Sequence, residues 1–308
     1  MPDWAWPAPP SERDSTEATA RSRQGGSVSK ELSQAVRKRQ PAFGAFVVEF
    51  STPGIGHLCA AAGCEFVFLD MEHSGFSIET VKATLKYLEA GGVPALVRPP
   101  SRDYDHIARV LDIGADGVVL PLVSTPEEAR RIVDCVKYPP VGHRGIGLGL
   151  AHDRYRPGVP AEKLKAANQE TLVVLQIETE EGAAKADAIA AVDGVDALWI
   201  GHYDLSASLG IPGQFSHPKF VAAIDATIAA CRKHKRSLGI LVGSVDDGIK
   251  SLKRGFNLLC YSSDAWLFRD ALGAGIAGLR AATAKTALGA RAAAVTGRAP
   301  VRKNRGKG

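Results

Sequence analysis

The sequence lacks any apolar run of the roughly 18 residues that a membrane-spanning helix needs. Its first residues, MPDWAWPAPPSERDSTEATARSRQGGS, also lack the apolar segment of a secretion signal. They carry acidic side chains, which are uncommon in organellar transit peptides. We therefore expect a cytoplasmic protein whose residues 1–40 form a disordered arm rich in proline.

Cysteine is scarce, and its spacing excludes the common structural uses of thiols. The five cysteines form no CxxC pair and no Cys/His zinc pattern, and the sequence has no HExxH motif. The simplest interpretation is that they are free thiols in a reducing compartment.

Acidic residues are absent from the C-terminal end. From Ala281 onward there are seven basic residues and no acidic ones, so this segment accounts for more than the whole net charge of +5. Its low-complexity end, TGRAPVRKNRGKG, predicts a disordered basic tail over residues 283–308. A solvated tail is the preferred interpretation, and contact with nucleic acid or anionic lipid is the alternative.

The body of the chain alternates between short apolar runs and longer segments of helical period. The runs are continuously apolar, as parallel strands covered on both faces are. There are eight of them: 43–50, 65–70, 94–99, 116–121, 171–178, 196–201, 237–242 and 256–261. Eight such units over residues 41–282 predict an α/β fold, a closed (β/α)8 TIM barrel. A doubly wound open sheet is the alternative, although no GxGxxG follows the first run.

Ionisable residues follow several of the apolar runs, where the strands of a barrel end. They are Asp70, Glu72 and His73 after the second run, Arg98 in the third, Glu178 in the fifth and Asp204 after the sixth. Because the loops at the carboxyl ends of barrel strands form one rim, we expect these side chains to converge at one mouth. No lysine ends a predicted strand, which disfavours a Schiff-base mechanism.

Glu178 and Asp204 are the best candidates for metal ligands. Two facing carboxylates repel each other, and a hard divalent cation between them would relieve that repulsion. The alternative is a salt-bridge network in which Arg98 or Arg144 neutralises them. Arg98 precedes two prolines, so its guanidinium is held in place and suits a carboxylate or a developing enolate.

Four further candidates belong to proton transfer and to substrate binding. His73 can act as a general base because imidazole titrates near neutral pH, although it could equally be a solvated rim residue. Asp112 could orient His73 or be a helix-end residue without a role. The long insert 139–170 carries His152 and Arg154, which form either a basic lid over an anionic substrate or an exposed loop.

Over about residues 41–282 the chain resembles the HpcH/HpaI aldolase family, which contains metal-dependent class II pyruvate aldolases. The motifs that carry the resemblance are FLDMEH, VRPP, LDIGADGVVLPLV, YPPVGHRGIG, LQIET and GHYDLS. It implies that Glu178 and Asp204 bind Mg, Mn or Co and that Arg98 holds the keto oxygen of pyruvate. It also implies a proton-transfer dyad of His73 and Asp112.

The resemblance implies further site residues and an assembly. Asp70 would lie near metal-bound waters, and the substrate would contact Gly201, Tyr203 and Asp204. In the insert, His152 or Arg154 would meet the far carboxylate of the acceptor. Family members are commonly hexamers in which the last helix packs on a neighbouring subunit.

From these observations we expect a divalent-metal-dependent aldolase that makes or cleaves a 4-hydroxy-2-oxo acid through a pyruvate enolate. The partners would be pyruvate, an aldehyde and further copies of the chain, as a hexamer or trimer. One alternative is oxaloacetate decarboxylation or macrophomate-synthase-like chemistry at the same site. A non-catalytic barrel with a nucleic-acid-binding tail is less favoured. In the motif GHYDLS, many relatives have proline and a small residue in place of His202 and Tyr203, which leaves the acceptor open.

Overall fold

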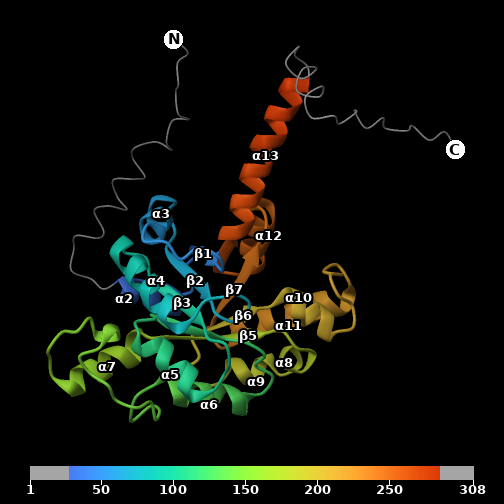
Figure 1. Cartoon of the computed structure of the whole chain (residues 1–308). Coiled ribbons are helices and arrows are strands. Elements are labelled where there is room, and N and C mark those ends of the chain that lie inside the picture. The colour runs from blue at the N-terminus through green and yellow to red at the C-terminus, as the bar shows by residue number, and fades with distance from the viewer. Residues whose placement is uncertain (1–27, 285–308) are drawn as a thin grey trace. The chain divides into compact units, whose positions relative to one another are not determined.

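The computed structural model describes residues 28–284. Eight parallel strands close into a barrel in the order of the sequence, with β1 pairing to both β2 and β8 (Figure 1). The strands are β1 (Ala42–Val47), β2 (Phe66–Asp70), β3 (Ala95–Arg98), β4 (Gly117–Leu120), β5 (Leu172–Ile177), β6 (Ala197–Ile200), β7 (Ser237–Val242) and β8 (Leu258–Ser263). The predicted (β/α)8 barrel is confirmed, and the open-sheet alternative is wrong.

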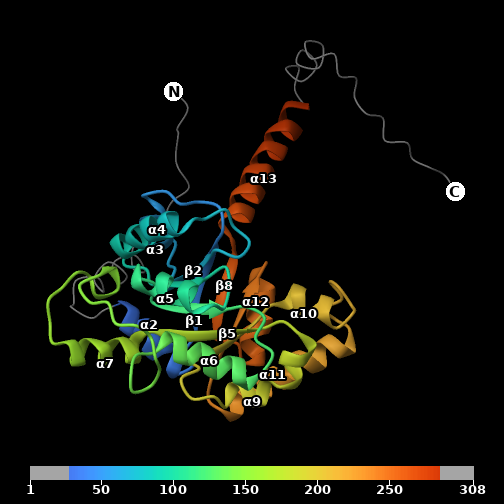
Figure 2. The same cartoon turned by 60° about the horizontal axis from the view of Figure 1, so that its bottom comes forward.

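Helices alternate with the strands, and those between β1 and β8 lie around the barrel, as the turned view in Figure 2 also shows. The helices of residues 28–284 are α2 (Val28–Arg37), α3 (Ile55–Ala61), α4 (Ile78–Gly91), α5 (Tyr104–Asp112), α6 (Pro126–Val136), η1 (Ala151–Asp153), α7 (Pro160–Glu170), α8 (Glu180–Ala184), α9 (Ala186–Ala190), α10 (His202–Ser208), α11 (Pro218–Lys233), α12 (Val245–Arg254) and α13 (Asp264–Ala284).

The alternation of side chains along each strand divides the core into two layers. Phe66 and Phe68 of β2 belong to the cluster inside the barrel, where Phe68 meets Trp199 of β6 with ring centroids 5.2 Å apart. Val67 and Leu69 belong to the outer cluster, which also contains the buried faces of the helices. The same parity directs Asp70, two positions after Phe68, into the barrel interior at its carboxyl end.

A helix that the sequence did not predict lies at the amino-terminal ends of the strands. Within the arm expected over residues 1–40, residues 28–37 form α2. Leu32 and Val36, one helical turn apart, join the cluster inside the barrel. Arg37 binds Asp196 at 2.8 Å, just before β6. Residues 1–27 and 285–308, with most of the predicted tail, lie outside the described residues.

The chain after Asp264 forms a separate unit, whose described part is most of α13. This helix exposes large apolar side chains along its length, including Leu272, Ile276 and Leu279. Within residues 28–284, no helix combines the length and hydropathy required to cross a membrane.

Candidate active site

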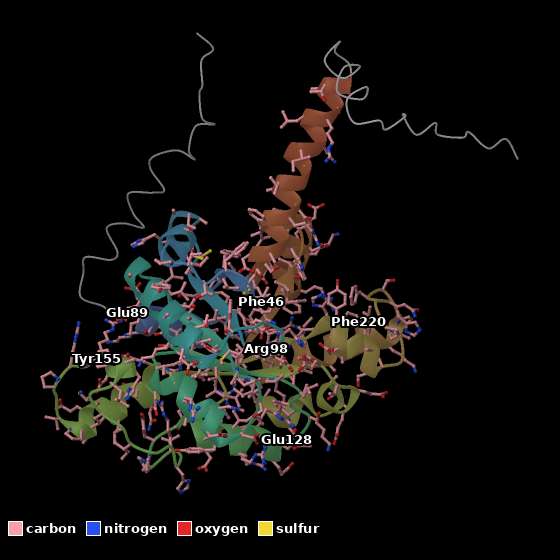
Figure 3. The ribbon with its side chains drawn as sticks, viewed as in Figure 1. Phe46, Glu89, Arg98, Glu128, Tyr155 and Phe220 are labelled. Carbon is pink, nitrogen blue, oxygen red and sulfur yellow. The ribbon has the colours of Figure 1, made fainter. Side chains whose placement is uncertain are left out.

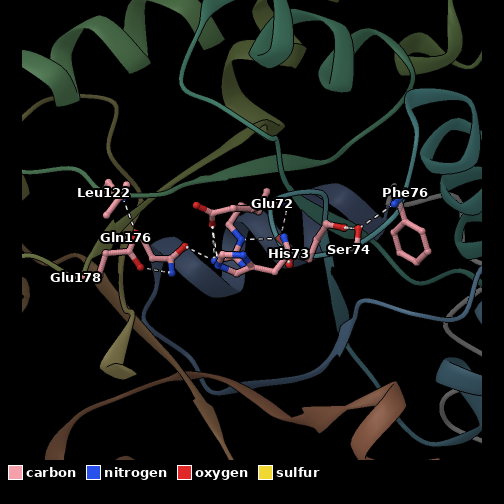
Figure 4. A network of polar contacts seen from close by, with 9 residues as sticks. Glu72, His73, Ser74, Phe76, Leu122, Gln176 and Glu178 are labelled. Carbon is pink, nitrogen blue, oxygen red and sulfur yellow. Dashed lines mark hydrogen bonds and ion pairs between the residues drawn. The ribbon is translucent and has the colours of Figure 1, made fainter. Parts of the chain in front are cut away.

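Arg98, labelled in Figure 3, is the centre of a polar network at the carboxyl end of the barrel, and Figure 4 labels Glu72, Gln176 and Glu178 of that network. Strand pairing sets it beside Asp70, and its Nε donates to Asp70 Oδ1 at 2.6 Å. Its Nη1 lies 2.9 Å from Glu72 Oε2 and 3.4 Å from Gln176 Oε1. Burial alone would lower the pKa of Arg98, but Asp70, Glu72 and Glu178 raise it. The guanidinium is therefore a fixed positive charge, only 5% exposed.

Two aromatic rings also hold Arg98 in place. Its guanidinium carbon lies 5.5 Å from the ring centroid of Phe68 and 5.7 Å from that of Phe46. Among the described residues, none hydrogen-bonds to Nη2 of Arg98. The carboxylates and rings fix the side chain and leave this N–H group for another acceptor.

Asp70 also shapes the loop that follows β2. Its carboxylate accepts hydrogen bonds from the backbone N–H groups of Glu72 at 3.0 Å and His73 at 3.1 Å. Ser74 Oγ in turn donates to the Asp70 carbonyl at 2.5 Å. The turn leaves the His73 side chain 66% exposed, with Nε2 3.8 Å from Glu72 Oε2. His73 therefore lies at the rim next to Glu72, which in turn pairs with Arg98.

Glu178 is a buried carboxylate with an altered pKa. Its Oε1 accepts from the Leu122 backbone N–H at 2.6 Å, and its Oε2 accepts from Gln176 Nε2 at 2.7 Å. The pKa of Glu178 is raised to about 7, mainly by burial; the Leu122 hydrogen bond and Arg98 lower it, and the negative charges of Asp204 and Glu72 raise it. Glu178 is therefore a buried carboxylate with two other acidic side chains near it.

Gln176 is a site residue that sequence reasoning missed. It is the polar residue inside an otherwise apolar run, two positions before Glu178, so strand parity directs it into the barrel as well. It is buried and joins Arg98 to Glu178 through its two amide atoms. That position in the run was the signal available in the sequence.

Asp204 lies in the first turn of α10 and is exposed, close enough to Glu178 to raise its pKa. Gly201, between them, has no space for a side chain, because a Cβ there would lie 2.2 Å from Glu178 Oε2. No cluster of three or more His, Cys, Asp or Glu side chains in residues 28–284 is placed to hold a metal. The donor set is two carboxylates, and each has further lone pairs for a hard cation. These residues fit such an ion if other oxygen ligands complete its coordination.

The comparisons with known proteins agree with this geometry. The HpcH/HpaI aldolase/citrate lyase family model matches residues 44–271. This chain belongs to that family. It is 37% identical over 224 residues, 72% of this chain and 87% of the relative, to a hydroxypyruvate/pyruvate aldolase of Sagittula stellata. It is 33% identical over 218 residues, 71% and 81% of the two chains, to a 2-keto-3-deoxy-L-rhamnonate aldolase of Klebsiella pneumoniae.

A solved structure supports the same assignment. The HpcH/HpaI aldolase from Desulfitobacterium hafniense DCB-2 superposes with a TM-score of 0.77 at 30% identity, covering 81% of this chain and 96% of that one. The prediction of an enzyme of the HpcH/HpaI aldolase family is therefore confirmed.

One part of the family pattern is not assembled within a single chain. Asp112 is the last residue of α5, and barrel helices run antiparallel to the strands, so it lies at the end of the barrel opposite His73. Its carboxylate binds Arg144 Nη2 at 2.6 Å, and no hydrogen bond or ion pair joins it to His73 in the described chain. The expected pair of His73 and Asp112 is thus not made here. Arg144, engaged at that end, cannot neutralise Glu178 either.

The insert also lies away from the mouth. His152 Nε2 contacts the Gly147 carbonyl at 2.6 Å, and Arg154 binds Glu89 at 3.2 Å. Both residues line a cavity of about 370 Å³ that also includes Asp116 and Ala95, at the amino-terminal ends of the strands. The insert follows α6 and packs beside the start of β3 and β4, so within one chain His152 and Arg154 lie away from the mouth, and their contact with the acceptor stays a prediction. Tyr203, in contrast, directly precedes Asp204 at the mouth.

Proposed function

We propose that this chain is a divalent-metal-dependent aldolase that makes or cleaves a 4-hydroxy-2-oxo acid through the enolate of pyruvate. The observation that carries the proposal is the pair of carboxylates, Glu178 and Asp204, beside the fixed cation Arg98. Burial raises the pKa of Glu178 to about 7, and the negative charge of Asp204 is a further cause. A bound cation, as a second positive charge beside Arg98, would lower that pKa again. Relatives named as aldolases of 2-oxo acids support the same reaction class.

Glu178 and Asp204 would hold the ion, with Mg, Mn or Co as the candidates from the family resemblance. When bound, such an ion acts as a Lewis acid toward the carbonyl group of an oxo acid. The interior position of Glu178, its two hydrogen bonds and the bare backbone of Gly201 would keep the first carboxylate in one orientation. Asp70 would keep the neighbouring loop in place through its hydrogen bonds to the backbone N–H groups of Glu72 and His73.

Arg98 would orient the oxo acid and stabilise the charge that develops on its oxygen. Its Nε and Nη1 are bound to carboxylates and an amide oxygen, whereas Nη2 is available. A donor fixed before the reaction costs no reorganisation when the enolate forms, which is the condition for electrostatic catalysis. Gln176 would hold Arg98 and Glu178 at their separation.

His73 would move the proton. In the cleavage direction its imidazole takes the proton of the 4-hydroxyl group, the C3–C4 bond breaks, and the electron pair stays on C3 as the enolate. In the synthetic direction the same imidazole returns a proton to the new alkoxide. Its ring is exposed at the rim, where a bound molecule can reach it, and Nε2 lies 3.8 Å from Glu72 Oε2.

We also propose that the active enzyme is a homo-oligomer whose copies share active sites. The family pattern pairs His73 with Asp112, yet one chain separates these residues to opposite ends of its barrel. The pair can therefore form only between copies. Any role of His152 and Arg154 in binding the acceptor would need a second copy for the same reason.

The proposal is tested by assaying the full-length protein for cleavage of 4-hydroxy-2-oxo acids and for decarboxylation of oxaloacetate, with Mg, Mn or Co and after chelation. We expect retro-aldol activity that chelation abolishes and that borohydride with pyruvate leaves intact. A protein that acts only on oxaloacetate would be a decarboxylase using the same enolate. A protein inactive with all three metals would refute the proposed function.

A further inference from the structure

A cluster of aromatic rings lies beside the proposed metal ligand Asp204. We define this aromatic cluster as His202, Tyr203 and Phe215. The His202 ring centroid is 4.6 Å from that of Tyr203 and 5.2 Å from that of Phe215, and Tyr203 and Phe215 are 5.3 Å apart in an edge-to-face arrangement. Such contacts stabilise the rings in one geometry.

The aromatic cluster is anchored on one side and open on the other. Phe215 meets the buried Phe220 of α11, with ring centroids 5.4 Å apart (Phe220 is labelled in Figure 3). Tyr203 nevertheless remains 60% exposed and Phe215 38% exposed. Because the rings are packed on one side and exposed on the other, they present an apolar surface that already has its final geometry. Little conformational freedom is lost when a ligand covers such a surface.

The position of the aromatic cluster connects it to the reaction. His202 is the first residue of α10, directly after β6, and Asp204 lies in the same first turn. Tyr203 is the neighbour of Asp204 in the chain, and Gly201 on the other side abuts Glu178. A molecule that reacts at the carbon next to these carboxylates therefore has the aromatic cluster within reach.

The charges on this side of the mouth do not select an acidic acceptor. With a divalent ion between them, the carboxylates of Asp204 and Glu178 would carry no net charge and would not attract a second carboxylate on the aldehyde. Arg98 would use its remaining Nη2 on the oxo acid, and Arg102 binds Glu128 at 3.0 Å. An uncharged ring gains from stacking here and needs no charged partner.

We propose that the aromatic cluster is the acceptor subsite of this enzyme and that it selects an uncharged aromatic aldehyde. This inference rests on the proposed function. The reaction it implies is an aldol addition: the methyl carbon of pyruvate loses a proton and bonds to the aldehyde carbon, and the aldehyde oxygen gains a proton. Atoms and electrons balance without an oxidant or reductant. Tyr203 and Phe215 bind the aldehyde ring, and His73 and Arg98 act on the reacting atoms.

The test compares three aldehydes with pyruvate as the donor: benzaldehyde, propanal and succinic semialdehyde. We expect the wild-type kcat/KM to be at least tenfold higher for benzaldehyde than for either of the others. Phe215→Ala should lower the benzaldehyde value about tenfold, mainly through KM, and leave the propanal value unchanged. Phe215→Leu, which keeps apolar bulk without a ring, should show the same loss of preference if the variant with alanine is unstable.

Two further variants make the comparison specific. Tyr203→Phe should keep the preference, because the ring remains. Phe43→Ala is the matched control, since Phe43 is 46% exposed at the amino-terminal end of β1, away from the mouth. Each variant is checked by circular dichroism and by its oligomer size.

Exchange of the pyruvate methyl protons with deuterium, followed by NMR, distinguishes failure of the acceptor subsite from failure of the proposed function. Exchange that persists in Phe215→Ala while the benzaldehyde preference disappears supports the acceptor subsite. Exchange without any preference for benzaldehyde, or a preference for succinic semialdehyde, overturns the inference and leaves the proposed function standing. A change of oligomer size in Phe215→Ala would show that a second copy covers the cluster, which also overturns the inference. Absence of exchange with every metal refutes both.

Discussion

Replacing Glu178 with glutamine should stabilise the metal-free protein at alkaline pH while abolishing its activity. Glu178 is 3% exposed, and burial raises its pKa from an ordinary 4.5 to about 7. Each pH unit between these two values is worth about 1.4 kcal/mol, so ionising the buried carboxylate costs about 3 kcal/mol of folding free energy. The amide of glutamine carries no charge and avoids that cost.

The net effect is smaller because one hydrogen bond changes. The amide oxygen of glutamine still accepts from the Leu122 N–H, but its NH2 group cannot accept from Gln176 as Oε2 does. The loss of that bond costs about 1 kcal/mol. We therefore expect Glu178→Gln to be about 2 kcal/mol more stable than the wild type at pH 8.5.

The sign of the pH dependence follows from the raised pKa. The contribution of Glu178 to stability is fully present below pH 4.5, where it is protonated in both states, and is lost as the pH rises through about 7. The advantage of Glu178→Gln should thus be absent at pH 5 and largest at pH 8.5. The measurement is urea unfolding of chelator-treated protein at both pH values, at equal protein concentration. Equal advantages at pH 5 and pH 8.5, or none at either, would refute the assignment of a destabilising buried charge.

Three further predictions concern the chemistry of the site. His73→Ala should lower kcat for retro-aldol cleavage by about 10²- to 10⁴-fold, as expected for loss of a general base. Its Mg²⁺ affinity in calorimetry should stay that of the wild type, and a lost affinity would move His73 into the ligand set. Co-expression of His73→Ala with Asp112→Asn should restore activity to about a quarter of the sites in a mixed symmetric oligomer. Mixed oligomers as inactive as either parent would rule out a shared site. Gly201→Ala should weaken Mg²⁺ binding at least tenfold, because its Cβ would lie 2.2 Å from Glu178 Oε2, whereas Gly54→Ala, with nothing within 4 Å, serves as the control. Unchanged Mg²⁺ binding in Gly201→Ala would show that binding does not depend on the present position of the Glu178 carboxylate.

The local periodicity of the chain was sufficient to predict the barrel and the end of it at which the polar residues gather. Eight apolar runs predict eight strands because a strand buried on both faces has no solvent-exposed face and so carries apolar residues throughout. The period of two along a strand then sends Asp70 and Arg98 inward, and the common direction of the strands collects them at one rim. For these residues no long-range information was necessary.

Only the tertiary structure decided which polar residues meet and which are separated. Asp112 lies in a motif of the family resemblance, and His152 and Arg154 lie in the insert, but the sequence of a segment does not state at which end of the barrel the segment lies. The reversal of direction in each helix carries Asp112 away from His73, and the insert returns to the start of β3. Likewise, the ring contact between Phe215 and Tyr203 joins a loop residue to α10. The chain between them has no regular period from which that contact could be predicted. Such contacts depend on how whole elements pack, which the spacing of residues along the chain does not encode.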